Sequence, residues 1–210
     1  MLAGPRQCPD QAGLLGLVAG VDEAGRGCLA GPVVAGAVIL PRDYHLPGLT
    51  DSKALTAVKR EHLAQAIKAQ ALSWALGFSW PREIEDLNIL QASLLAMARA
   101  VTALACVPDH ILVDGNQPLP LFITQQSIVG GDILCPCISA ASIVAKTFRD
   151  ALMIGLDKRY PGYGFAKHKG YATQRHQKAL RTLGPCVAHR YSFRGVTGSH
   201  QERKLCLPNI

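Results

Sequence analysis

Charged residues and long hydrophobic runs are both scarce in this sequence. Of its 210 residues only 18% are Asp, Glu, Lys or Arg, against about 25% in a typical soluble domain. The longest apolar stretch without charge runs from Gly27 to Pro41 and is interrupted by glycine and proline, whereas a membrane-spanning helix needs about 20 apolar residues. The apolar run 11–21 is followed at once by Asp22 and Glu23 and favours a buried strand over a signal peptide. The sequence therefore predicts a protein without a membrane partner.

Paired cysteines and a nucleotide-binding loop are also missing. The seven cysteines are scattered without a Cys-x-x-Cys pair, and only Cys135 and Cys137 are close together. No second pair or flanking histidine completes a zinc site. We therefore expect reduced cysteines that serve as small apolar side chains in a cytoplasmic protein. No segment has the GxxxxGK[ST] pattern, which excludes a P-loop.

Acidic residues are absent from one long segment near the C-terminus. Residues 158–201 contain nine Lys or Arg, no Asp or Glu, and interleaved His, Tyr and Phe. The rest of the chain has 13 basic and 15 acidic residues, so the net charge of +7 arises from this segment. Basic residues mixed with aromatic ones are typical of nucleic-acid binding, although we expect the aromatic rings to lie mostly in the core. His168 has no suitably spaced partner and is assigned to the surface or to a phosphate contact.

The chain between its ends predicts an α/β fold. Apolar runs with strand character alternate with segments of helical periodicity, which favours a mixed sheet covered by helices on both faces. The short glycine-rich link between the first two runs predicts an antiparallel hairpin. Strands are expected at residues 15–22, 32–40, 72–78, 110–114 and 121–128. Helices are expected at 55–69, at 90–104, from a cap at Ser139 or Ser142 to 155, and from Thr173 to a stop at 184–185.

Carboxylates follow two of these apolar runs. The segments VAGVDEAG and ILVDG both end in acid followed by glycine, at Asp22-Glu23 and at Asp114. A carboxylate at the end of a buried strand is costly unless a positive charge compensates it. Asp132 adds a further acid in a glycine-rich context. If the strands are neighbours, these carboxylates converge and can bind a hard divalent cation.

Asp22 and Glu23 are adjacent in the chain, which constrains how both can reach one site. Asp22 and Glu23 point to opposite faces of a regular strand, so both can serve one site only if the strand ends or bulges there. The alternative is that the acids cap helices and end turns, which is the ordinary role of Asp-Gly pairs.

A phosphate contact is predicted directly beside these acids. In Gly25-Arg26-Gly27, the glycines let backbone N–H groups approach a ligand while the guanidinium reaches a phosphate. A metal site and an anion contact side by side indicate phosphoryl-transfer chemistry.

Several motifs resemble those of one known family, ribonuclease HII, the type 2 ribonuclease H of bacteria. The resemblance covers roughly residues 17–195, and its motifs occur in the family's order. They are GVDEAGRG (20–27), AGPVVAGAVIL (30–40), DSKAL (51–55), VDGN (113–116), ISAASIVAKTFRD (138–150), YPGYGFAKHKGYAT (160–173), LGP (183–185) and HRYSF (189–193). The resemblance implies a ribonuclease H-like mixed sheet flanked by helices, with a helical C-terminal extension. We expect one catalytic domain over 14–198, basic from about 158, with loose tails at 1–13 and 199–210.

The resemblance also implies an activity and a partner. The enzyme would cleave the RNA strand of RNA–DNA hybrids and nick 5′ to single ribonucleotides in duplex DNA, as a monomer that uses Mg²⁺ or Mn²⁺. It implies these site residues: Asp22, Glu23, Asp114 and Asp132 as catalytic metal ligands; Gly25, Arg26 and Gly27 at the ribonucleotide; Tyr171 on the sugar at the RNA–DNA junction; and Ser52, Lys53 and Lys146 at backbone phosphates. Cys28, Gly130 and Tyr191 depart from residues that are frequent in the family, but every acid is present.

Two other functions are compatible with parts of the sequence. A noncatalytic nucleic-acid-binding protein would use the basic segment alone, and its acids would be structural. A glycosidase with a carboxylate pair would explain two acids, but it leaves the basic segment and Gly25-Arg26-Gly27 unexplained.

Overall fold

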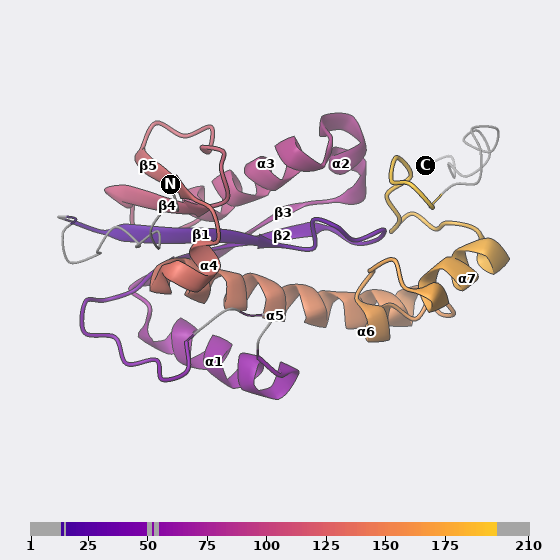
Figure 1. The fold of residues 1–210 in the computed structure, drawn as a ribbon, viewed down its shortest axis with the longest axis horizontal. Coiled ribbons are helices and arrows are strands. Elements are labelled where there is room, and N and C mark those ends of the chain that lie inside the picture. Colours follow the sequence, from indigo (N-terminus) through magenta and orange to yellow (C-terminus); the bar gives the residue numbers. More distant parts are fainter. Residues whose placement is uncertain (1–13, 15, 50–51, 53–54, 197–210) are drawn as a thin grey trace, which may run out of the picture.

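A five-stranded mixed sheet forms the centre of the fold (Figure 1). The computed structural model describes residues 14, 16–49, 52 and 55–196, so the predicted tails lie outside the described residues. The strands are β1 (Val18–Ala24), β2 (Val33–Ile39), β3 (Ser73–Ser79), β4 (His110–Asp114) and β5 (Thr124–Ile128). Their order is β3-β2-β1-β4-β5. The first three pair antiparallel, whereas β1–β4 and β4–β5 are parallel, which confirms the predicted hairpin and the mixed sheet.

Helices cover both faces of this sheet (Figure 1). They are α1 (Ala57–Gln70), α2 (Pro81–Leu87), α3 (Ile89–Thr102), α4 (Gly131–Leu134), α5 (Pro136–Arg159), α6 (Phe165–His168) and α7 (Gln174–Leu183). Helix α3 packs on β1, β2 and β3, while α5 packs on the opposite face and is itself covered by α1. The central strands β1 and β2 are buried along nearly their whole length, as their continuous apolar runs predict. Helix α6 packs against α5, and α7 lies beyond the C-terminal end of α5 (Figure 1).

Helix α5 starts earlier than its sequence indicates. Its N-cap is Cys135 and Pro136 occupies the first turn, so the prediction that Ser139 or Ser142 caps the helix is wrong. Proline suits the first turn because its missing N–H has no partner there. The two serines lie inside the helix, where their hydroxyl groups turn toward the acidic residues. Ser139 donates to the backbone oxygen of Asp132 at 2.5 Å.

Two glycines allow α5 to lie unusually close to the sheet. A Cβ atom at Gly20 would overlap the backbone of Cys137 and Ile138, and one at Gly36 would overlap the backbone of Ala141. The first turns of α5 are thereby brought directly against β1 and β2, next to the strand end that carries Asp22.

The cysteines only partly follow the prediction. Cys28, Cys106, Cys137 and Cys186 are free. Cys135 is disulfide-bonded, contrary to the expectation that every cysteine is reduced, because pairing depends on proximity in space that spacing in sequence does not reveal. No helix in the described part of the chain is long and apolar enough to cross a membrane.

Candidate active site

The site lies where β1 continues past its parallel neighbour β4. The pairing between these strands ends at Val21 and Val113, whereas β1 runs on to Ala24 alongside β2. Asp22 and Glu23 therefore follow the last paired residue, beside Asp114 at the end of β4. The strand does not need to end for the two acids to share a site, because it is the neighbouring pairing that stops.

Asp22 is the most deeply buried of these acids, with a relative exposure of 5%. Its Oδ1 accepts a hydrogen bond from the backbone N–H of Glu23 at 2.6 Å. Burial raises the pKa of Asp22 well above its ordinary value, and the charges of Glu23 and Asp114 raise it further. The hydroxyl of Ser142 on α5 acts in the opposite direction by donating to the carboxylate. The site thus holds negative charge that its own residues compensate incompletely.

Glu23 is partly buried and faces a cation. Its Oε1 lies 3.5 Å from Nη1 of Arg26, and its side chain is 11% exposed. Burial raises the pKa of Glu23; Arg26 lowers it, and the charge of Asp114 raises it again. Asp22 and Glu23 both interact electrostatically with Asp114, so the three carboxylates are brought together as the sequence predicts.

Asp132 reaches the same place through a turn. Oδ1 of Asp114 accepts hydrogen bonds from the backbone N–H of Gly131 at 2.8 Å and of Asp132 at 3.4 Å. The chain enters this turn through Gly130, whose φ of 72° lies in the left-handed region that favours glycine. Asp132 is buried, at 6% exposure. Asp114 therefore anchors the segment that carries the fourth acid.

The donor set fits a divalent cation of the Mg²⁺ or Mn²⁺ type. Carboxylate oxygens are the ligands that hard cations prefer, and the raised pKa values of Asp22 and Glu23 mark uncompensated charge that a cation would relieve. Among the described residues, no three Asp, Glu, His or Cys side chains lie together in a group that could hold a metal ion by itself. Mg²⁺ does not require three protein ligands, because it is typically held by one or two carboxylates together with water and substrate phosphates.

The loop after β1 presents Arg26 and Gly27 to solvent. Both residues are exposed, and half of the Arg26 side chain is accessible (51%). Gly25 has a φ of 93° and is buried, so it needs the conformational freedom of glycine. The structure thus places Gly25-Arg26-Gly27 one residue after Glu23, with Arg26 paired to Glu23 and half exposed to solvent.

Tyr171 lies next to this loop, on the segment between α6 and α7. The residue is 43% exposed, and Nζ of Lys146 lies 5.6 Å from the ring centroid. Lys146 also pairs with Asp150, one turn further along α5, at 2.7 Å. The backbone N–H of Leu29 donates to the carbonyl of Gly170 at 2.8 Å, which ties the two segments together. An exposed aromatic face with an ammonium beside it can contact a sugar and its phosphate.

Of the two DSKAL residues predicted to contact phosphates, the structure describes only Ser52. Ser52 is buried, at 2% exposure, and its Oγ lies 3.0 Å from Oγ of Ser142. Since Ser142 donates to Asp22, Ser52 stands behind the acidic site rather than on its surface. Lys53 lies outside the described residues.

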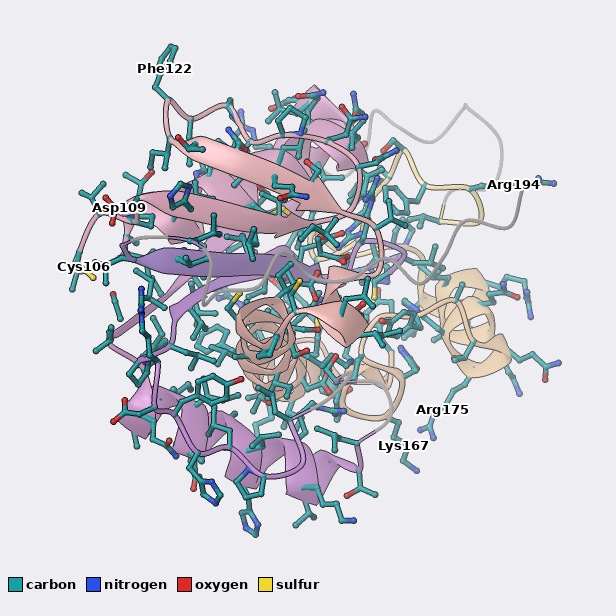
Figure 2. The ribbon with its side chains drawn as sticks, turned by 60° about the vertical axis from the view of Figure 1, so that its left-hand side comes forward. Cys106, Asp109, Phe122, Lys167, Arg175 and Arg194 are labelled. Carbon is teal, nitrogen blue, oxygen red and sulfur yellow. The ribbon has the colours of Figure 1, made fainter. Side chains whose placement is uncertain are left out.

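The basic segment divides into an exposed part and a buried part. Lys167, Arg175 and Arg194 project outward from the C-terminal region (Figure 2). The exposed basic residues of the segment are Lys158, Arg159, Lys167, Arg175, Lys178, Arg181 and Arg194. Arg190, by contrast, is completely buried. The guanidinium of Arg190 is bound by backbone carbonyls, so this residue of the basic segment does not face a ligand.

The prediction that His168 lies at the surface or contacts a phosphate is also wrong. It is buried, at 9% exposure, and its Nε2 lies 2.8 Å from the carbonyl of Tyr163 while its Nδ1 accepts from the N–H of Gly170. It stacks on His176 with ring centroids 4.3 Å apart. Tyr163 and Phe165 are buried, as predicted for the aromatic residues.

Sequence reasoning missed Ser142 and Arg149 altogether as parts of this region. Both stand in the ISAASIVAKTFRD motif that carries the family resemblance. The available signal was their position in that motif, since neither an alcohol nor an arginine in a helix indicates a site by itself.

The chain is similar to known proteins in sequence and in fold. The sequence matches the family model for Ribonuclease HII over residues 19–196. A Ribonuclease HII of Nitratidesulfovibrio vulgaris is 56% identical over 203 residues, which cover 91% of this chain and 92% of that protein.

Solved structures show the same fold. The ribonuclease H2 from Pyrococcus horikoshii OT3 superposes with a TM-score of 0.72 at 26% identity, covering 86% of this chain and 95% of that one. Bst-RNase HIII in complex with Mn²⁺ superposes with a TM-score of 0.64 at 20% identity, covering 86% of this chain and 68% of that one.

Proposed function

The chain belongs to the ribonuclease HII family, and from this premise we propose that Asp22, Glu23, Asp114 and Asp132 form its catalytic, metal-binding centre. Membership makes it a ribonuclease H, a metal-dependent endonuclease that hydrolyses RNA in RNA–DNA hybrids. The observation that carries the assignment of residues is the burial of Asp22 beside Glu23 and Asp114, which raises the pKa of both Asp22 and Glu23. Buried like charges of this kind are costly in a site that binds no cation.

The reaction is hydrolysis of one phosphodiester bond. A water oxygen attacks the phosphorus, the bond to the 3′ oxygen breaks, and the products carry a 5′-phosphate and a 3′-hydroxyl. When bound, Mg²⁺ or Mn²⁺ supplies charge neutralisation at the phosphate and activation of the water. The carboxylates of Asp22 and Asp114 hold their positions through backbone N–H donors, so the site is arranged before substrate arrives.

The substrate contacts follow from what is exposed around the acids. Arg26 and the flanking Gly25 and Gly27 lie where they can grip the ribonucleotide and its phosphates, and Tyr171 offers its ring to the sugar at the RNA–DNA junction. Lys146 stands beside that ring as a phosphate contact. This set supports nicking on the 5′ side of a single ribonucleotide embedded in duplex DNA, in addition to cleavage of longer hybrids.

Two of the remaining residues have more modest roles in this proposal. Lys53 serves as a phosphate contact by its place in the motif, while the burial of Ser52 favours support of Asp22 through Ser142. The exposed basic residues of the C-terminal part would follow the nucleic-acid backbone.

The enzyme would act as a monomer, with one catalytic domain over residues 14–198 whose basic helical part begins at about residue 158. Helix α5 supports this extent because it runs from the sheet into the C-terminal part, where it contacts α6. We place the enzyme in the cytoplasm, where its nucleic-acid substrate occurs. The four free cysteines in the described part of the chain agree with a reducing compartment, whereas the disulfide at Cys135 does not.

The test is the position and the metal dependence of the cut. A labelled DNA duplex with one internal ribonucleotide is incubated with the protein in Mg²⁺, in Mn²⁺ or in EDTA, beside an all-DNA duplex of the same sequence. The proposal requires a single nick 5′ to the ribonucleotide in either metal, with no nick in EDTA or in the all-DNA duplex. Absence of cleavage in both metals would refute it.

A further inference from the structure

Two arginines far apart in sequence are completely buried beside the loop after β1. Arg149 on α5 and Arg190 near the C-terminus both have a relative exposure of 0%. Neither guanidinium forms an ion pair with a carboxylate among the described residues. Burying a guanidinium is costly unless all its donors are satisfied. Two such groups side by side therefore require a specific set of acceptors.

Backbone carbonyls of the loop supply the acceptors of Arg190. Its Nη1 donates to the carbonyl of Arg26 at 2.8 Å and its Nη2 to that of Gly25 at 2.8 Å. Its Nε and Nη2 both donate to the carbonyl of Gly31, at 3.0 and 2.8 Å. The guanidinium of Arg190 thus binds both ends of the loop, at Gly25 and Arg26 on one side and at Gly31 on the other. Burial lowers the pKa of Arg190 to about 10, which leaves it charged at neutral pH.

Arg149 joins the same loop to the segment that carries Tyr171. Its Nε donates to the carbonyl of Pro32 at 3.0 Å and its Nη2 to that of Ala30 at 3.1 Å. Its Nη1 donates to the carbonyl of Lys169 at 2.9 Å, two residues before Tyr171. A Cβ atom at Gly25 would overlap the Arg149 guanidinium, so the loop lies directly on it.

These bonds fix the direction of the loop's N–H groups. In a trans peptide the C=O of one residue and the N–H of the next point in opposite directions, and the described chain contains no cis peptide. Since the carbonyls of Gly25 and Arg26 point down to Arg190, the N–H groups of Arg26 and Gly27 point away from it. Both residues are exposed. Successive N–H groups aimed outward from a glycine loop form an anion-binding concavity.

We propose that Arg190 is a positioning residue for substrate recognition: by binding the loop carbonyls it aims the N–H groups of Arg26 and Gly27 at a substrate phosphate. Arg149 holds Tyr171 in register with this phosphate site. The proposal rests on the proposed function, because it takes the loop to be a substrate contact. It assigns Arg190 no contact with the nucleic acid, although the residue belongs to the basic segment.

The conservative variant Arg190→Lys separates this role from a merely structural one. Lysine keeps the charge but lacks the planar fork that reaches three carbonyls at once. The variant loses about one charge-assisted hydrogen bond to the loop, so the loop is aligned less well for binding. We therefore expect its KM for the single-ribonucleotide duplex to be on the order of tenfold higher than that of the unchanged enzyme. The kcat of the folded enzyme should stay nearly unchanged, because the acids are untouched.

Arg99→Lys is the matched control. Arg99 also donates to a backbone carbonyl, that of Phe78 at 2.7 Å, but on α3 and with a salt bridge to Glu83. This variant should keep the KM of the unchanged enzyme. Equal KM values for Arg190→Lys and the unchanged enzyme would overturn the inference while leaving the proposed function intact. Failure of the unchanged enzyme to nick the duplex would instead refute the proposed function.

A measurement on the unchanged protein covers the case in which Arg190→Lys does not fold. The amide resonances of Arg26 and Gly27 are followed by NMR while the ribonucleotide-containing duplex is added in EDTA, which prevents cleavage. Downfield shifts of both amide protons would support the inference. Shifts near Tyr171 without any at Arg26 and Gly27 would contradict it.

Discussion

The Nε2 atoms of His176 and His189 lie 3.1 Å apart, in a site where both side chains are completely buried. Nδ1 of His176 lies 2.9 Å from the carbonyl of Tyr171 and must donate to it, which leaves its Nε2 as an acceptor. Nδ1 of His189 accepts from the N–H of Cys186 at 3.0 Å, so its Nε2 carries the proton. The two neutral rings therefore form a chain of hydrogen bonds, in which His189 donates to His176 and His176 donates to the carbonyl of Tyr171.

The burial of these two neutral histidines predicts that the protein loses stability in mild acid. Burial, followed by the electrostatic interaction with the titratable His176 ring, lowers the pKa of His189 from 6.5 to about 4. Below about pH 6.5 the unfolded chain therefore binds a proton at His189 that the folded chain does not bind. The stability that neutral His189 contributes to the folded state is fully present above about pH 6.5 and is lost as the pH falls toward 4. The loss is on the order of 3 kcal/mol.

Urea unfolding between pH 7 and pH 4 measures this dependence. His189→Gln keeps an N–H donor for His176 but cannot be protonated, so its free energy of unfolding should fall less steeply with decreasing pH. The exposed His62→Gln on α1 should follow the unchanged protein. An identical slope for His189→Gln and the unchanged protein would rule out His189 as the source.

Close packing of α5 on β1 gives a second prediction. The Cβ atom introduced by Gly20→Ala would overlap the backbone of Cys137 and Ile138, and neither backbone can move without displacing the helix. We expect a loss of about 2 kcal/mol or more in the free energy of unfolding. Gly155→Ala on α5, where nothing lies within 4 Å of the added atom, should be neutral or stabilising. Equal stability of the two variants in urea would show that the contact is unimportant.

Tyr171 gives a prediction about substrate choice. Tyr171→Ala should lose cleavage at a single ribonucleotide by an order of magnitude or more, from the loss of ring contact with the sugar. Binding of the duplex, measured in EDTA, should weaken much less, since the basic residues remain. Tyr171→Phe should retain most of the activity because it keeps the ring. Parallel losses of binding and cleavage in Tyr171→Ala would contradict a role in reading the junction.

Much of the fold and the acidic site is predictable from the sequence because both depend on local patterns. Continuous apolar runs identify β1, β2 and β4, and the acids at the ends of two runs identify Asp22 and Asp114. The convergence of these acids required only that β1 and β4 be neighbours, which the parallel pairing confirms.

The supporting residues were not predictable in the same way. Arg190 has the sequence context of a nucleic-acid contact, yet its acceptors are carbonyls 159 to 165 positions away. Likewise, the first turns of α5, which begins at Pro136, pack closely on the sheet where Gly20 and Gly36 have no side chains. Bonds of this kind become visible only when distant segments are placed in space.

The most direct test of the central claim is the cleavage rate of Asp114→Asn on the single-ribonucleotide duplex in Mn²⁺ and Mg²⁺. The amide keeps the size of the side chain and an oxygen that can accept from Gly131, so the variant should fold and bind the duplex. It removes a negative charge that a catalytic cation requires. We expect cleavage to fall by at least about a hundredfold in both metals while duplex binding in EDTA is retained. Cleavage by Asp114→Asn at the rate of the unchanged enzyme would contradict the assignment of the acids.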